Sequence, residues 1–185
     1  MVILRPTRRL RALLPTVAVS TRSDTALGDW YVNRLVVGRQ PLLLLVSSMS
    51  LLPIVLPARD VRSLPDRLAV AIASRLQRLG IEPEAIQVEC HAMHPVIVAP
   101  TVDRSVIGIM VDFAKAVQFN ADVGLSTEQG LVEVENLLAQ TPCHAASASD
   151  RVVFPDQKAP ALLRAAWLPQ GPLHPPSGTG RVVVH

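Results

Sequence analysis

The chain has 185 residues, of which 49% are hydrophobic and only 3% aromatic, and its formal net charge is +3. This length allows one domain with a real core, built mainly from aliphatic side chains. Two cysteines exclude a disulfide framework, and the apolar run 42–56 is broken by serines and Pro53 and is too short to span a membrane. The N-terminal stretch gives no convincing export signal. We therefore expect a cytoplasmic protein without a membrane segment.

The first half of the chain predicts β-strands. "MVILRP" at 1–6 indicates a short strand, and residues 29–37 have the aromatic, β-branched and aliphatic composition of another. "LLLLV" within 41–47 is apolar at every position, as in a central strand covered on both faces. The hairpin signal "GRQP" at 38–41 joins the strands 29–37 and 41–47. The next strand, 51–56, would complete a three-stranded antiparallel meander. Pro53 lacks a ladder donor, which places this strand at an edge or a bulge.

The second half predicts helices. Apolar residues at helical spacing indicate four of them, and a short strand lies between prolines at 95–99; the helical ranges are 63–79, 83–93, 104–118 and 127–139. We expect an α+β fold in which these helices bury their apolar stripes on one face of a small, mostly antiparallel sheet.

The C-terminal part of the chain differs from the rest in composition. Residues 146–185 are rich in proline, glycine and serine, which predicts a largely disordered tail behind a single domain over 1–145. Within this tail, "APALLRAAWL" at 159–168 indicates a short helix with Trp167 as an anchor. The terminal "RVVVH" has the composition of an added strand, although we expect a disordered end.

Charge is distributed unevenly along the chain. Residues 1–62 hold nine Arg against three Asp, whereas residues 80–140 hold nine acidic residues against one Arg and one Lys. This asymmetry predicts either a match between the two halves or a basic surface that meets an anionic partner. The sixteen Arg against two Lys also fit a genome rich in G and C, which produces such a bias without selection for phosphate binding.

Five stretches together resemble a family of bacterial proteins known only as a domain of unknown function. They are "LRPTRRL" (4–10), "LGDWYVN" (27–33), "SLLPIVLPA" (50–58), "DRSVIGIMVDF" (103–113) and "AQTPC" (139–143). The resemblance extends over about residues 1–145 and implies a cytoplasmic, single-domain α+β protein without a known activity.

The chain also departs from that family pattern. Val111-Asp112 stands where the family has an Asn-Asp pair, and Ser47, Ser48 and Met49 replace a polar Asn and a charged residue. A polar site at those positions of the family would be partly lost here.

The strongest candidate site is Asp29-Trp30-Tyr31, because Trp and Tyr combine a large apolar area with a hydrogen-bonding tip. Strand alternation directs Trp30 and Tyr31 to opposite faces, so at most one of them is needed in the core. Asn33 shares the face of Tyr31. The alternative is that Asp29 ends a turn and one aromatic simply enters the core.

A second candidate lies at the start of the predicted helix 104–118. Arg104 beside free backbone N–H groups would receive an anion such as phosphate, and Asp112 follows on the same helix. The alternative is that Asp103 or Ser105 caps the helix while Arg104 pairs with a carboxylate.

The cysteines and histidines give a weaker pattern. Cys90, His91 and His94, with Cys143 further on, are zinc-ligand types, but no Cys-x-x-Cys pair accompanies them. Cys90 falls on the apolar stripe of its helix and is expected in the core. We therefore predict no metal site and no cofactor, and we find no nucleophile elbow or phosphate-binding glycine loop.

Three classes of function remain open. The first is a non-enzymatic binding or regulatory module that recognises a protein or nucleic-acid partner through the aromatic surface and the basic N-terminal half. The second is a small enzyme with a site formed by Asp29, Tyr31, Asn33, Arg104 and Asp112. The third is a structural, self-associating domain in which the acidic region of one copy meets the basic region of another.

Overall fold

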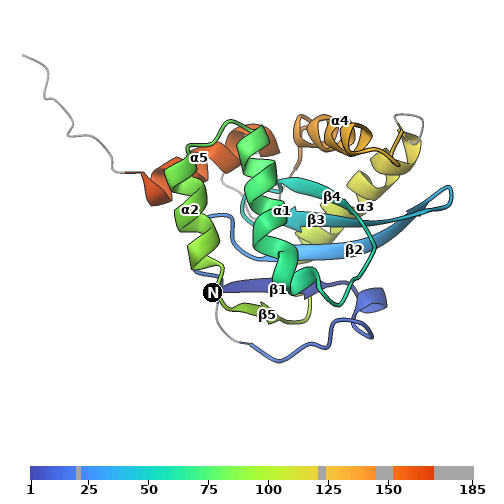
Figure 1. Ribbon diagram of the computed structural model, residues 1–185, viewed down its shortest axis with the longest axis horizontal. Helices are drawn as coiled ribbons and strands as arrows, with labels where there is room; N and C mark the ends of the chain where they lie inside the picture. The colour runs from blue at the N-terminus through green and yellow to red at the C-terminus, as the bar shows by residue number, and fades with distance from the viewer. Residues whose placement is uncertain (20–21, 121–123, 145–151, 169–185) are drawn as a thin grey trace, which may run out of the picture.

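A computed structural model describes residues 1–19, 22–120, 124–144 and 152–168 (Figure 1). Five strands form one sheet in the order β4-β3-β2-β1-β5. The strands are β1 (Val2–Pro6), β2 (Trp30–Val37), β3 (Gln40–Ser47), β4 (Pro53–Pro57) and β5 (Val96–Val98). The helices are η1 (Arg8–Leu10), α1 (Leu64–Arg78), α2 (Pro83–Ala92), α3 (Arg104–Phe119), α4 (Glu128–Ala139) and α5 (Pro155–Trp167). The predicted α+β class is confirmed, and every predicted strand and helix among these residues is present.

The sheet is mixed. Strands β2, β3 and β4 form the predicted antiparallel meander, but β1 runs parallel to both of its neighbours, β2 and β5. Parallel neighbours need long connections, and residues 7–29 between β1 and β2 supply one. The chain reaches β5 from β4 only after passing through α1 and α2, which supplies the other.

The helices cover both faces of the sheet, so the expectation that they lie on one face is wrong. Helices α1, α2 and α5 pack with Trp30 and Leu43 in one core. Helices α3 and α4 pack with Tyr31 and Leu44 in a second core on the opposite face. The physical reason is visible in β3, where consecutive leucines alternate between faces and all of them are buried. A strand that is apolar on both sides needs a helical layer on each side.

Strand β4 lies at the edge of the sheet, as Pro53 predicted. Backbone N–H groups alternate in direction along a strand, so residues 53, 55 and 57 share the outward direction. Two of these residues are proline, which has no N–H, and the N–H of Val55 donates to Glu135 Oε1 at 2.8 Å. The outer side of β4 therefore offers no free backbone donor.

Helix α5 continues the packed structure beyond residue 145. It starts at Pro155, earlier than the helix indicated at 159–168, and Ala159 and Leu163 are fully buried in the core with α1 and α2. Trp167 anchors its end, because the indole Nε1 donates to Glu89 Oε2 at 2.6 Å. The remaining residues of the predicted tail, 146–151 and 169–185 with the terminal "RVVVH", lie outside the described residues. Across the described ranges, no helix has the length and apolar character needed to cross a membrane.

Candidate functional site

A cleft of about 810 Å³ opens at the amino end of β2, and we refer to it as the Tyr31 cleft. Its walls come from the start of β2, the turn between β3 and β4, the start of α3, and α5. The lining residues are Arg5, Arg22, Ser23, Thr25, Gly28, Asp29, Tyr31, Ser48, Met49, Leu51, Val102, Asp103, Val153, Lys158 and Leu162. Segments distant in sequence therefore meet around one cavity.

The floor of the cleft contains an ion pair between Arg5 and Asp29. Arg5 Nε donates to Asp29 Oδ2 at 2.5 Å, and its Nη1 donates to the carbonyl oxygen of Pro100 at 2.5 Å. Ser23 Oγ donates to the other carboxylate oxygen, Oδ1, at 2.6 Å. The backbone N–H of Asp29 donates to Ser48 Oγ at 2.9 Å. Both carboxylate oxygens are thus engaged, so Asp29 fixes the positions of its neighbours.

Tyr31 places a protonated hydroxyl at the cleft. Its side chain is buried, and its oxygen accepts a hydrogen bond from the backbone N–H of Asp103 at 3.0 Å. Burial raises the pKa of Tyr31, and this effect outweighs the lowering by backbone hydrogen bonds and by Arg5. The phenol therefore keeps its proton at neutral pH and acts as a hydrogen-bond donor as well as an acceptor.

Two residues with left-handed backbone shape the wall of the cleft. Gly28 has φ of +74°, and a Cβ atom there would lie 2.5 Å from Ser48 Oγ. Leu51 has φ of +60° although it is not glycine, and its side chain is buried. Such a conformation costs on the order of 1 kcal/mol and persists only when the surrounding packing enforces it. The turn between β3 and β4 is therefore held in one shape beside the cleft.

The rim of the cleft combines exposed apolar and basic side chains. Met49 is 55% exposed and Val102 is 70% exposed, and both line the same cleft. Arg22 and Lys158 add positive charge to the same rim. The cleft therefore presents apolar contact area around a polar floor.

The structure brings together two of the residues predicted from the first candidate site. Asp29 and Tyr31 line the cleft, whereas Trp30 is fully buried in the opposite core. Trp30 and Tyr31 do face opposite sides, but neither is left at an exposed aromatic surface. Asn33 shares the face of Tyr31 but lies outside the cleft, where its Oδ1 accepts a hydrogen bond from Thr7 Oγ1 at 2.9 Å.

The two residues predicted on α3 do not reach the cleft. Asp103 caps this helix, because its Oδ1 accepts from the backbone N–H of Ser105 at 2.8 Å. Arg104 is exposed and is not among the residues that line the cleft. Asp112 is 71% exposed and pairs with Lys115 at 3.2 Å. The expected convergence of Asp29, Tyr31, Asn33, Arg104 and Asp112 is therefore not formed, since the helix directs its polar side chains away from the sheet.

Several residues of the cleft were not predicted. Arg5 had a usable signal, because it is the only charged residue in a strand that is otherwise apolar and buried. Ser48 had a signal only through the family pattern, whereas Ser23 and Lys158 had none, since positions in an irregular segment or on a helix become meaningful only when the chain is folded.

The cysteines and histidines lie in separate places. Cys90 is only partly buried, and its helix instead buries Glu89 completely. His91 and His94 are exposed. Burial raises the pKa of Cys143 to about 11, so this thiol is not a thiolate at neutral pH. Among the described residues, no group of three or more His, Cys, Asp or Glu side chains has the arrangement to hold a metal ion.

Glu89 connects α5 to the approach to the cleft. Its Oε2 and Oε1 accept from the backbone N–H groups of Ala26 and Leu27 at 2.9 and 3.0 Å. The same carboxylate accepts from the indole of Trp167. Because residues 26–27 directly precede Gly28 and Asp29, one buried carboxylate positions two walls of the cleft.

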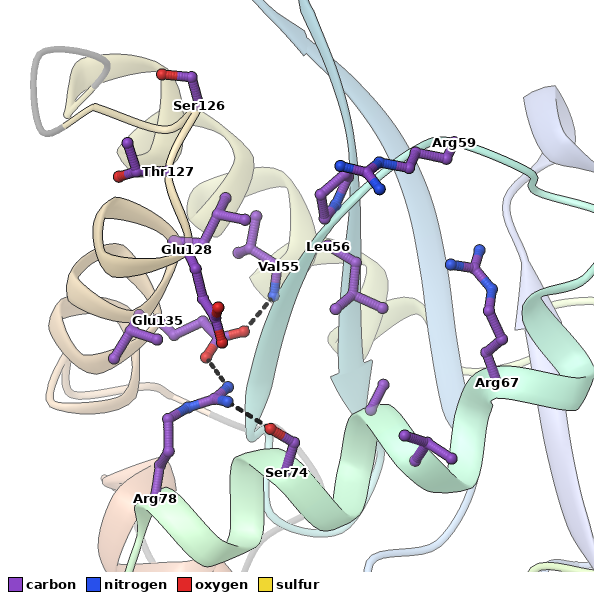
Figure 2. Close-up of a pocket in the computed structure, with 15 residues that line it drawn as sticks. Val55, Leu56, Arg59, Arg67, Ser74, Arg78, Ser126, Thr127, Glu128 and Glu135 are labelled. Carbon is purple, nitrogen blue, oxygen red and sulfur yellow. Dashed lines mark hydrogen bonds and ion pairs between the residues drawn. The ribbon is translucent and has the colours of Figure 1, made fainter.

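A second hollow, the β4 groove, lies along the edge strand between α1 and α4 (Figure 2). Its volume is about 400 Å³. At the base of the groove, Glu135 accepts two hydrogen bonds (Figure 2). Its Oε1 accepts from the backbone N–H of Val55, and its Oε2 accepts from Arg78 Nη2 at 2.7 Å. Arg75 is fully buried behind them, where its Nη1 donates to Asn136 Oδ1 at 2.7 Å and its Nη2 to the Glu135 carbonyl at 3.2 Å. The groove is thus built around a cross-link between helices on opposite faces of the sheet.

The sequence patterns that suggested a family meet at the Tyr31 cleft. Arg5, Asp29, Leu51 and Asp103 each come from a different one of those patterns. Cys143, from the fifth, forms a β-bridge with Val153, which lines the cleft. Neither a curated protein nor a solved structure matches the chain. Residues 3–158 match the family described as a domain of unknown function, DUF6933, and the chain belongs to that family.

Proposed function

We propose that the protein is a non-enzymatic binding module of the bacterial cytoplasm, and that the Tyr31 cleft receives a segment of a protein partner. The observation that carries this proposal is the exposure of Met49 and Val102 beside the fixed polar groups of the floor. Large apolar side chains around a few oriented hydrogen-bonding groups are typical of binding sites. Met is adaptable in shape, which suits it to a protein contact.

The charges of the rim favour an acidic segment. Arg22 and Lys158 line the cleft, and the Arg5 guanidinium lies beneath them, although Asp29 neutralises Arg5. Asp103 is already engaged in capping α3. An acidic side chain on the partner would meet Arg22 on the rim, while its apolar neighbours pack on Met49 and Val102.

The state of the reactive groups favours binding over covalent or acid–base chemistry. The Tyr31 phenol and the Cys143 thiol both hold their protons at neutral pH, because burial raises both pKa values. Asp29 has both oxygens occupied by donors from the protein. The Tyr31 hydroxyl therefore suits recognition in its protonated state.

Selection of peptides from a phage-displayed random library on the purified protein tests this proposal. We expect acidic peptides with apolar residues, and fluorescence polarisation should show at least about tenfold weaker binding to Met49→Ser and Val102→Ser. Val36→Ser is the matched control, because Val36 is 57% exposed and lies outside the cleft. Peptides that bind all three variants equally, or a selection without enrichment, would contradict the proposal.

A further inference from the structure

Exposed arginines gather at one end of the sheet. Strands β1 and β4 both run in the same direction as β2, so the segments that follow all three strands leave the sheet toward the same end. Helix η1, the β2–β3 hairpin turn and the β4–α1 connection all emerge there, and they lie at the right of Figure 1. These segments and the carboxyl-terminal half of β2 carry six arginines. We call the surface that they form the arginine end: Arg8, Arg9, Arg34, Arg39, Arg59 and Arg62.

The arginine end is not neutralised by the protein. All six side chains are exposed, and within the described residues none of them has a carboxylate at ion-pair distance. Arg5, Arg78 and Arg164, elsewhere in the chain, each pair with an acid. The nearby carboxylate of Asp60 instead accepts from the backbone N–H of Arg62 at 3.1 Å. The arginine end therefore keeps a net positive charge, which favours contact with an anion.

The segments that carry these arginines offer no aromatic surface on which bases could stack. Trp30 and Tyr31, the aromatic residues of β2, are both buried, and no aromatic residue occurs in η1, the hairpin turn or the β4–α1 connection. Proteins that bind single strands rely on exposed aromatic side chains, whereas contacts to a duplex are made largely to phosphates. The β2–β3 hairpin extends beyond β1, which pairs with β2 only as far as Val32. A protruding two-stranded ribbon has dimensions that fit the major groove of B-form DNA.

We propose that the arginine end binds the phosphate backbone of double-stranded nucleic acid without reading its sequence. The surface is separate from the Tyr31 cleft, which includes the β3–β4 turn at the opposite end of the sheet, so either proposal can fail alone. Guanidinium groups suit this role because they form paired hydrogen bonds to phosphate oxygens.

Fluorescence polarisation with the full chain and labelled 20-base-pair duplexes of DNA and RNA tests the inference. We expect binding at 50 mM salt that weakens by about a thousandfold at 200 mM if all six arginines contact phosphates. The double variant Arg39→Gln/Arg59→Gln should lower the slope of log affinity against log salt by about two, since each lost phosphate contact removes about 0.9. DNA and RNA duplexes should bind alike in salt dependence, because the phosphates are shared.

The matched control is Lys115→Gln/Arg164→Gln, which removes the same charge from the exposed surfaces of α3 and α5. This double variant should bind the duplex as the wild-type chain does. If both double variants weakened duplex binding equally, binding would depend only on the net charge of the protein, and the proposal would be overturned. Tighter binding to single strands, tighter binding to phosphatidylserine vesicles, or no duplex binding at 50 mM salt would also overturn it. Circular dichroism and thermal unfolding of both variants verify that each is folded.

Discussion

The Tyr31 cleft and the β4 groove each contain a partly buried Arg–carboxylate pair, but the surroundings of the two pairs differ. In the groove, Glu135 is buried and its oxygens go to the Val55 N–H and to Arg78, so the pair joins a strand edge to a helix. In the cleft, Arg5 and Asp29 lie next to the protonated hydroxyl of Tyr31 and beneath an exposed apolar rim. The pair in the groove holds the edge strand and the helices together. The pair in the cleft fixes the side chains on the floor of an open cavity.

This difference separates stability from function within one molecule. A charge that replaces a missing backbone partner is expected to matter mainly for folding. A charge that positions neighbours around an open cavity is expected to matter for what the cavity binds. The predictions below test this separation, beginning with the largest effect.

The largest loss of stability is expected from Glu135→Ala. The change leaves the Val55 N–H without a partner and removes the carboxylate that faces Arg78 and the buried Arg75. We expect the free energy of unfolding in urea to fall by about 3–5 kcal/mol. Glu133→Ala on the exposed side of the same helix is the control and should change it by less than about 0.5 kcal/mol. A loss below about 1 kcal/mol for Glu135→Ala would refute the structural role.

The next largest effect is expected from Gly28→Ala in the wall of the cleft. The new Cβ atom would overlap Ser48 Oγ at 2.5 Å and Met49 Cγ at 2.6 Å, in addition to the cost of positive φ. We expect a loss of about 2–4 kcal/mol in the free energy of unfolding. Gly38→Ala separates the two terms, because Gly38 has φ of +60° and open space around it, so only the backbone cost of about 1 kcal/mol remains. Equal losses for the two variants would show that the close approach is unimportant.

Alkaline pH should destabilise the protein through Cys143. Its folded pKa is raised to about 11 from the ordinary 9.0, mainly by burial and secondarily by Asp112. The unfolded chain therefore loses this proton first as pH rises, so the associated stability is complete below pH 9 and is lost as pH passes through 11. The loss approaches about 2–3 kcal/mol. Urea unfolding between pH 8 and 11 measures it, and Cys143→Ala should flatten the curve, whereas an unchanged slope would assign the effect elsewhere.

The smallest stability effect is expected from Tyr31→Phe. The ring continues to pack against α3, and only the hydrogen bond from the Asp103 N–H is lost, at a cost of about 1 kcal/mol. Peptides selected on the cleft should nevertheless bind severalfold more weakly, because the hydroxyl can no longer donate to them. A large loss of stability with unchanged peptide affinity would show that Tyr31 serves folding and not binding, which would contradict the role assigned to the cleft.

The regular elements were largely predictable because burial imposes a simple period on the sequence. The stripe Leu68, Ile72 and Leu76 defined α1, and the predicted ends of this helix differ from the observed ones by one residue. The meander was equally clear, since the proline in β4 marked the edge. The allocation of helices to two faces follows from the doubly apolar β3, although the single-face layout overlooked this implication.

The site was less predictable because it depends on contacts between distant segments. Asp29 and Tyr31 were identified from local composition, but their partner Arg5 lies 24 residues from Asp29. Buried charges on helices had a partial signal. Arg75 and Glu135 occupy positions next to the apolar stripes of α1 and α4, where an amphipathic pattern expects no charge. Which groups they would meet could not be read from helical periodicity.

The closed outer side of β4 has a consequence for how copies of this protein encounter one another. An edge strand with free N–H groups is a template for aggregation, since a strand from another chain can extend the sheet. Here Pro53 and Pro57 supply no donor, and Glu135 occupies the N–H of Val55. The opposite edge, β5, has only three residues, and its Val98 carbonyl already accepts from the N–H of Val17 at 2.8 Å. Amyloid-like growth from the folded state should therefore require local unfolding of α4, so conditions that break the Glu135 contacts should also promote fibre formation.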